Sequence, residues 1–118
     1  MTYWKVVTHD WCSPLQGGPP DCAGTLPCDM PTVALDTGVE ECASGWHCTR
    51  DAAVALRVVG LWPNGHPARL LVVEPSADVV HRGDKSRSSG QRWVRSATTA
   101  EWEDAVRRLS ASFAPFVD

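Results

Sequence analysis

The feature that most constrains this chain is the run Arg69-Leu70-Leu71-Val72-Val73-Glu74, in which apolar residues continue without the alternation of a half-exposed strand. A strand of this kind is buried on both faces, so it lies inside a sheet rather than at its edge. At 118 residues the chain has the usual length of one domain and is too short for two independently stable halves. We therefore expect a single domain over residues 1–118, with other elements covering both faces of this central strand.

Further strands are predicted where aromatic and β-branched residues cluster between turn signals. The first of these strands covers Tyr3–Thr8 and delivers His9 to its carboxyl end. Shorter strands are expected at Val33–Leu35, at the edge of the sheet, and at Val79-Val80 and Arg92–Val94.

Two segments carry the signals of helices. Thr49-Arg50-Asp51 can start the first helix, with Thr49 capping free backbone N–H groups, and Gly60 can stop it. The second helix begins at the capping box Thr98–Glu101, and its apolar side chains recur at helical spacing: Trp102, Ala105, Val106 and Leu109. Together with the strands, these helices predict an α+β fold with a small mixed or antiparallel sheet.

Two other segments have the composition of loops. Ser13–Pro31 holds five of the nine prolines and three of the nine glycines, a density that predicts a long surface loop. Arg82–Gly90 is rich in serine and basic residues, and we interpret it as a solvated hairpin loop. The alternative is a cradle for a phosphate group that uses Arg82 and Lys85, although the glycine spacing is not that of a P-loop.

Composition excludes some classes of protein. No apolar run approaches the ~20 residues of a membrane helix, so a membrane protein is not expected. The net charge of −3 supplies no field that would gather nucleic acid, which disfavours a nucleic-acid partner. Because Met1–Lys5 lacks the layout of a signal peptide, we expect a cytoplasmic protein whose five cysteines are reduced.

The segment Gly45-Trp46-His47-Cys48-Thr49 gathers an aromatic ring, an imidazole, a thiol and a hydroxyl directly before the first predicted helix. The N-terminus of a helix has unpaired N–H groups and a positive dipole, so this corner predicts a site for a small anionic ligand. Its candidate ligand-binding residues include Ser44 and Arg50, which flank the segment, and Trp11, which could stack on a ring. The alternative is structural, with Trp46 and Cys48 in the core and His47 bound to a loop carbonyl.

Zinc binding is a rival hypothesis. Cys22 and Cys28 form one thiol pair with a gap of five residues, and Cys42 and Cys48 form a second pair of equal spacing. Structural zinc sites prefer gaps of about two to four residues, so the spacing also fits free thiols in the core or in loops.

Three motifs resemble those of an uncharacterised family of small bacterial and phage domains: Cys42-x-Ser44-Gly45-Trp46-His47, Val73-Glu74-x-Ser76 and Gly83-Asp84-Lys85-x-x-x-Ser89. The resemblance extends from Tyr3 to about Gln91 and departs at Ala77, where the family often has glycine, and at Cys48, since family members tend to place this cysteine one residue later. It implies a fold rather than an activity. Because the family includes phage domains, the resemblance also implies the alternative of a non-enzymatic accessory module linked to phages.

A second resemblance is to the ADP-ribosyltransferase-like fold, in which a first strand ends in histidine and a later strand of the pattern G-[FW]-x-H-[CS]-[ST] runs into a helix. His9 matches the first feature, and Gly45–Thr49 carries the glycine, aromatic, histidine, thiol and hydroxyl of the second. The resemblance implies a nucleotide- or NAD-handling transferase in which His9, His47 and Thr49 are catalytic and Arg50 pairs with phosphate. The alternative is a non-enzymatic binding module whose cleft holds a partner or zinc.

Overall fold

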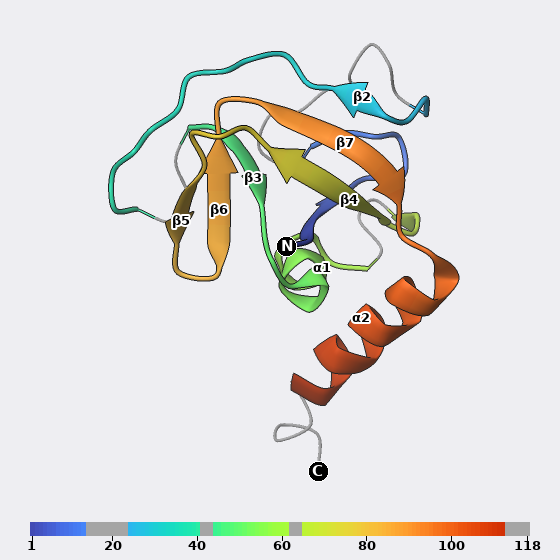
Figure 1. Ribbon diagram of the computed structural model, residues 1–118. Helices are drawn as coiled ribbons and strands as arrows, with labels where there is room; N and C mark the ends of the chain where they lie inside the picture. Colours follow the sequence, from blue (N-terminus) through green and yellow to red (C-terminus); the bar gives the residue numbers. More distant parts are fainter. Residues whose placement is uncertain (14–23, 41–43, 62–64, 113–118) are drawn as a thin grey trace.

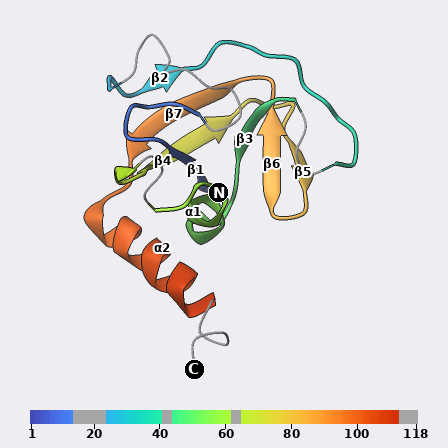
Figure 2. The same ribbon diagram turned by 180° about the vertical axis from the view of Figure 1, so that it is seen from behind.

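The computed structural model describes residues 1–13, 24–40, 44–61 and 65–112. Within these ranges the chain forms two antiparallel sheets and two helices, which confirms the predicted α+β fold (Figure 1). Both helices lie at one end of the molecule, below the strands in that view, and the opposite view shows the same arrangement (Figure 2).

The first sheet is built around the predicted central strand. It has the order β1-β4-β7-β2, and its strands are β1 (Tyr3–Val7), β4 (Arg69–Pro75), β7 (Gln91–Ser96) and β2 (Cys28–Asp29). β4 pairs with β1 on one side and with β7 on the other, so its central position is confirmed. Its alternate side chains face different layers, as expected for a strand buried on both faces, because Leu70 packs toward the helices and Leu71 toward the second sheet.

The second sheet corrects two sequence predictions. It has the order β3-β6-β5, with β3 at Trp46–Cys48, β6 at Lys85–Ser88 and β5 at Val80–Arg82. β6 occupies much of the segment that was interpreted as a solvated loop, and three of its four residues are buried. Val33–Leu35 is not a strand; the edge of the first sheet is instead β2, within the segment interpreted as a long loop.

The two sheets are joined where β1 passes the end of β3. Trp4 and Thr49 exchange two backbone hydrogen bonds, of 2.7 and 2.9 Å, in an antiparallel bridge. This bridge fixes the start of the first helix against the first strand, because Thr49 lies three residues before the helix.

The two helices match their predicted positions. α1 (Ala52–Val59) ends at Gly60, whose φ of 89° is costly for other residues and whose N–H donates to the carbonyl of Leu56. α2 (Thr99–Ser112) begins with the predicted capping box, in which Glu101 N–H donates to Thr98 Oγ1 and Thr98 N–H donates to the Glu101 carboxylate.

The buried side chains form two clusters on opposite faces of the first sheet. One cluster lies between this sheet and the helices and contains Val6, Ala52, Ala55, Leu56, Ala68, Leu70, Ala105 and Leu109. The other includes residues of β3 and contains Val7, Cys28, Met30, Trp46, Cys48, Leu71, Val73 and Trp93. The strand β1 therefore contributes to both clusters, and its residues alternate between them.

Arg87 on β6 anchors the loop formed by residues 36–40. Its side chain is 1% exposed, and its guanidinium donates to the backbone carbonyls of Asp36 (2.6 Å), Gly38 (2.9 Å) and Glu40. A planar guanidinium has donors on several sides, so one side chain can hold several carbonyls of a turning loop. This bonding explains how a charged residue is buried in β6.

Candidate functional site

The chain bends at Gly45, directly before β3. Gly45 has a φ of 138°, and a Cβ at this position would lie 3.0 Å from Leu35 Cδ1 and 3.3 Å from the Ser88 carbonyl oxygen. A larger residue is therefore disfavoured by both backbone conformation and space. The bend places Trp46 and Cys48 in the core on one face of β3, and His47 on the other.

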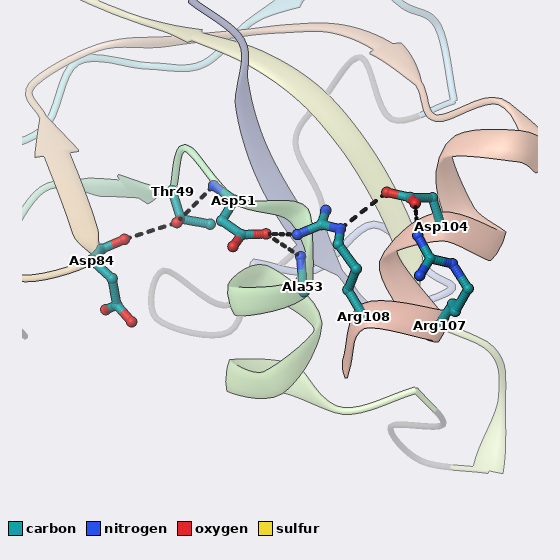
Figure 3. A network of polar contacts seen from close by, with 7 residues as sticks. All are labelled: Thr49, Asp51, Ala53, Asp84, Asp104, Arg107 and Arg108. Carbon is teal, nitrogen blue, oxygen red and sulfur yellow. Dashed lines mark hydrogen bonds and ion pairs between the residues drawn. The ribbon is translucent and has the colours of Figure 1, made fainter. Parts of the chain in front are cut away.

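Thr49 is not the N-cap of α1, as the sequence suggested; Asp51 is. The Asp51 side chain accepts a hydrogen bond of 3.0 Å from Ala53 N–H, while the Thr49 hydroxyl donates to the Asp84 carbonyl at 2.8 Å (Figure 3). Thr49 Oγ1 also accepts a hydrogen bond from Asp51 N–H. Thr49 therefore ties the helix start to the turn between β5 and β6.

The start of α1 is already occupied by a negative group of the chain itself. The Asp51 carboxylate also pairs with Arg108 of α2, which in turn pairs with Asp104 (Figure 3). Burial raises the pKa of Asp51, but the hydrogen bonds from Arg108 and Ala53 outweigh it, so the net pKa is lowered. The predicted anion site at this helix end is thus filled by Asp51, and Arg50 lies exposed beside it.

A pocket of about 230 Å³ lies where α1 faces β1 and β3. We call it the Lys5 pocket, and its lining residues are Trp4, Lys5, Val6, Ser13, His47, Cys48, Thr49, Val54, Ala55, Val58, Val59 and Lys85. Most of these residues are apolar, and the polar ones are Lys5 of β1, His47 of β3, Lys85 at the start of β6, and Ser13 and Thr49 outside the strands. An apolar cavity with a small number of polar groups is the usual form of a small-molecule site.

Lys5 is the most unusual group in this pocket. It is 5% exposed, its ammonium donates to the His47 carbonyl at 2.9 Å, and Nζ lies 5.8 Å from the centre of the Trp46 ring. Burial lowers the pKa of Lys5 to about 8, and the neighbouring Cys48 offsets this only partly. Lys5 is therefore mainly charged at pH 7, with about one tenth present as the neutral amine, and about half is neutral at pH 8.

His47 is held as a neutral imidazole. Burial, followed by the positive charges of Lys5 and Arg87, lowers the pKa of His47 to about 4. Within the described part of the chain, neither ring nitrogen makes a hydrogen bond of normal geometry, although the Gly45 carbonyl is near enough to favour the charged ring slightly. Buried ring nitrogens without such bonds are costly, and they are one mark of a functional site.

Cys48 is a protonated thiol. Burial raises its pKa to about 12, and the charge of Lys5 opposes this shift. A thiol in this state is a poor nucleophile and a poor metal ligand, because both roles require the thiolate.

The structure brings together only part of the predicted site. His47, Thr49 and Lys85 line the Lys5 pocket, whereas Trp46 is buried in the core with its Nε1 donating to the Pro31 carbonyl at 2.7 Å. Ser44 is exposed, and its carbonyl accepts a hydrogen bond from the backbone N–H of Asp36.

Arg82 is committed to the same loop that Arg87 holds. Its guanidinium donates to the carbonyls of Thr37 (2.7 Å) and Gly38 (2.6 Å), and it does not line the Lys5 pocket. The phosphate cradle considered for Arg82 and Lys85 therefore has one of its two cations engaged by the protein backbone.

His9 and Trp11 lie in a separate cluster at the end of β1. The His9 ring stacks on His66 with centroids 4.0 Å apart, and the guanidinium of Arg69 lies 4.5 Å from the centre of the Trp11 ring. The Arg69 side chain also donates to the His9 carbonyl at 2.6 Å. Neither His9 nor Trp11 lines the Lys5 pocket.

Sequence reasoning missed Lys5 and the α1 valines that form the apolar wall. The signal for Lys5 was available: Tyr3, Lys5 and Val7 share one face of β1, and Val7 is in the core. A lysine at the middle of that face is an uncommon buried cation. Ser13 also lines the pocket, but it lies at the start of the predicted loop and carries no such signal.

The cysteines differ from the expectation of reduced thiols. Cys12 and Cys48 are free, but Cys28 is disulfide-bonded. A disulfide is unusual in a reducing compartment, and its sulfur is not a thiolate ligand. Cys22 and Cys42 of the proposed zinc pairs lie outside the described residues, and no group of three potential metal ligands occurs in the described ranges.

Comparison with known proteins adds no relative. No protein-family model, no curated protein and no solved structure matches this chain. The class of the protein is therefore described from its fold and its pocket alone. It is an α+β domain of two antiparallel sheets with a mostly apolar pocket beside α1. None of the helices in the described ranges has the length and hydrophobicity to cross a membrane.

Proposed function

We propose that the protein binds a small planar ring in the Lys5 pocket, such as the base of a nucleotide or the nicotinamide of NAD. The observation that carries this proposal is the pocket itself, which combines apolar walls with Lys5 and His47. Apolar walls favour the faces of a ring, and the Lys5 amine can donate to an oxygen or nitrogen at its edge.

The size of the pocket favours a ring over a whole dinucleotide. Drug-sized ligands occupy cavities of roughly 300–1,000 Å³, and the Lys5 pocket has about 230 Å³. The ribose and phosphates of a nucleotide would therefore extend outside, where Lys85 lies at the pocket wall and Arg50 is exposed before α1.

The proposal concerns binding and not ADP-ribosyl transfer. The transferase hypothesis assigns a catalytic role to His9, but His9 stacks on His66 and is not among the pocket residues. Of the three predicted catalytic residues, His47 and Thr49 line the pocket, and the Thr49 hydroxyl already donates to a backbone carbonyl.

Ligand titration followed by tryptophan fluorescence tests the proposal, since Trp4 lines the pocket and reports on its occupancy. Nicotinamide, NAD and adenosine monophosphate are added up to millimolar concentration. We expect a saturable change with at least one of them. No saturable change with any of the three would overturn the proposal.

A matched pair of variants locates the binding site. Val58 lines the pocket and is 55% exposed, so Val58→Glu places a charge at the pocket wall without burying it. Val39 is 87% exposed on the loop of residues 36–40, so Val39→Glu makes the same change away from the pocket. We expect Val58→Glu to weaken binding at least tenfold and Val39→Glu to leave it unchanged.

A further inference from the structure

We propose that the Lys5 pocket also takes planar ring compounds that carry an aldehyde or ketone group, with which the Lys5 amine acts as a nucleophile and forms an imine. This inference rests on the proposed function, because a ring must enter the pocket before its carbonyl group can meet the amine.

The position of Lys5 supports this chemistry. Lys5 is 5% exposed and is one of the residues that line the pocket, so we infer that a bound ligand meets its amine where bulk water hardly reaches. A site that excludes water protects an imine from hydrolysis.

The bonding of Lys5 is incomplete. An ammonium group has three donors, and in the described part of the chain Lys5 has one hydrogen-bond acceptor, the His47 carbonyl, with the face of Trp46 nearby. No carboxylate of the described residues lies within ion-pair distance of its Nζ. A buried lysine without a counter-ion readily loses its proton, which is how imine-forming lysines are activated.

The neighbouring groups do not compete for the carbonyl group. The Cys48 thiol is protonated, because burial raises its pKa to about 12. His47 cannot form an imine, because neither nitrogen of its imidazole carries two hydrogens, and burial and the nearby cations lower its pKa to about 4, so it is a weak base. The Lys5 amine, with its pKa lowered to about 8 by burial, is therefore the available nucleophile at the inner wall.

The reaction balances without an oxidant or a reductant. The nitrogen lone pair of neutral Lys5 attacks the carbonyl carbon, a C–N bond forms as the π bond of the carbonyl group breaks, and one proton passes from the nitrogen to the oxygen to give a neutral carbinolamine. The C–O bond then breaks, and the oxygen leaves as water with a second proton from the nitrogen. One amine and one carbonyl compound thus give one imine and one water molecule.

Reductive trapping tests the inference, and the chain contains its own control. The only lysines in the sequence are Lys5 and Lys85, and Lys85 is partly exposed and lies 3.6 Å from a carboxylate oxygen of Asp84. The folded protein is treated with pyridine-3-carbaldehyde and cyanoborohydride, digested, and analysed by mass spectrometry. We expect the reduced adduct on Lys5 at least tenfold above that on Lys85, and more labelling at pH 8 than at pH 6. Equal labelling of the two lysines, or labelling of Lys85 alone, would overturn the inference.

A second ligand separates this inference from the proposed function. Pyridine-3-methanol has the same ring but no carbonyl group, so it can bind without forming an imine. If pyridine-3-methanol changes the tryptophan fluorescence but the aldehyde leaves Lys5 unmodified, the imine is refuted and the binding pocket stands. If the alcohol binds and also suppresses labelling of Lys5, both the binding pocket and the imine are supported. If the alcohol does not bind and no adduct forms, both are refuted.

Discussion

Two buried cations, Lys5 and Arg87, are bonded very differently. Both are nearly inaccessible, at 5% and 1% exposure, and both lie close enough to His47 to lower its pKa. Arg87 donates to three backbone carbonyls of the loop 36–40, whereas Lys5 donates to the His47 carbonyl. Arg87 is enclosed by the protein, and Lys5 forms part of a pocket wall.

The difference separates a structural charge from a candidate functional one. A buried charge is tolerated when hydrogen bonds replace the water it has lost, as they do around Arg87. When these hydrogen bonds are too few, a buried cation loses its proton more easily. Burial accordingly lowers the pKa of Lys5 to about 8. A polar group that lines a cavity and lacks some of its hydrogen bonds can form them with a ligand, so it is a candidate functional group.

The largest expected effect is the loss of Arg87. Arg87→Met removes the donors to the carbonyls of Asp36 and Glu40 and leaves the Gly38 carbonyl with the hydrogen bond from Arg82 alone, so we expect a loss of about 3 kcal/mol of stability. Urea unfolding measures this loss. Arg87→Lys keeps the charge but not the planar set of donors, and we expect it to recover less than half. A loss below about 1 kcal/mol in Arg87→Met would show that the loop does not depend on this residue.

Lys5 should behave in the opposite way. Lys5→Met removes a buried charge and one hydrogen bond, and we expect a gain of about 1–2 kcal/mol at pH 7, because the burial cost exceeds the net value of one bond. The gain should shrink as the pH rises from about 8 to 10.5, since native Lys5 becomes neutral there while unfolded lysine still holds its proton. Urea unfolding at pH 7 and pH 10 checks both statements. A destabilised Lys5→Met protein at pH 7 would place Lys5 in the same class as Arg87.

The sequence predicted those parts of the fold that follow from local patterns. The central strand β4, the first strand β1 and both helices lie where apolar runs, helical spacing and capping residues indicate. These signals come from residues close together in the chain, so they can be read without knowing the tertiary structure.

β6 was missed because its stability comes from distant residues. The burial of Arg87 depends on the loop of residues 36–40, far away in the sequence, whereas Ser86 contacts His81 of the adjoining strand β5. A polar segment with no visible partners has the composition of a loop.

The candidate site also depends on contacts between residues far apart in the sequence. The pocket forms because α1 lies against β1, and His9 stacks on His66 instead of lining the pocket.

The pH dependence of stability tests whether the buried charges of Lys5 and Arg87 act on His47. Unfolded histidine takes up a proton near pH 6.5, but native His47 does so only near pH 4, because of burial and then the charges of Lys5 and Arg87. Stability should therefore fall as the pH drops from 6.5 toward 4, and we expect His47 to account for about 1 kcal/mol between pH 7 and pH 5 after allowing for partial exposure. His47→Gln should remove this contribution, and His66→Gln, at an exposed ring, serves as the control. An unchanged slope in His47→Gln would exclude His47 as its source.

Arg82 provides the smallest effect and isolates burial as the variable. It donates to the carbonyls of Thr37 and Gly38, in the same loop that Arg87 holds, but these hydrogen bonds are exposed to water. Water can replace the donors that Arg82→Gln removes, so we expect a loss of only about 0.5 kcal/mol, compared with about 3 kcal/mol for Arg87→Met. Urea unfolding of the two variants under the same conditions gives the ratio. Equal losses would show that the number of hydrogen bonds to the loop, and not their burial, decides the stability. The incomplete hydrogen bonding of buried Lys5 would then no longer indicate a functional group.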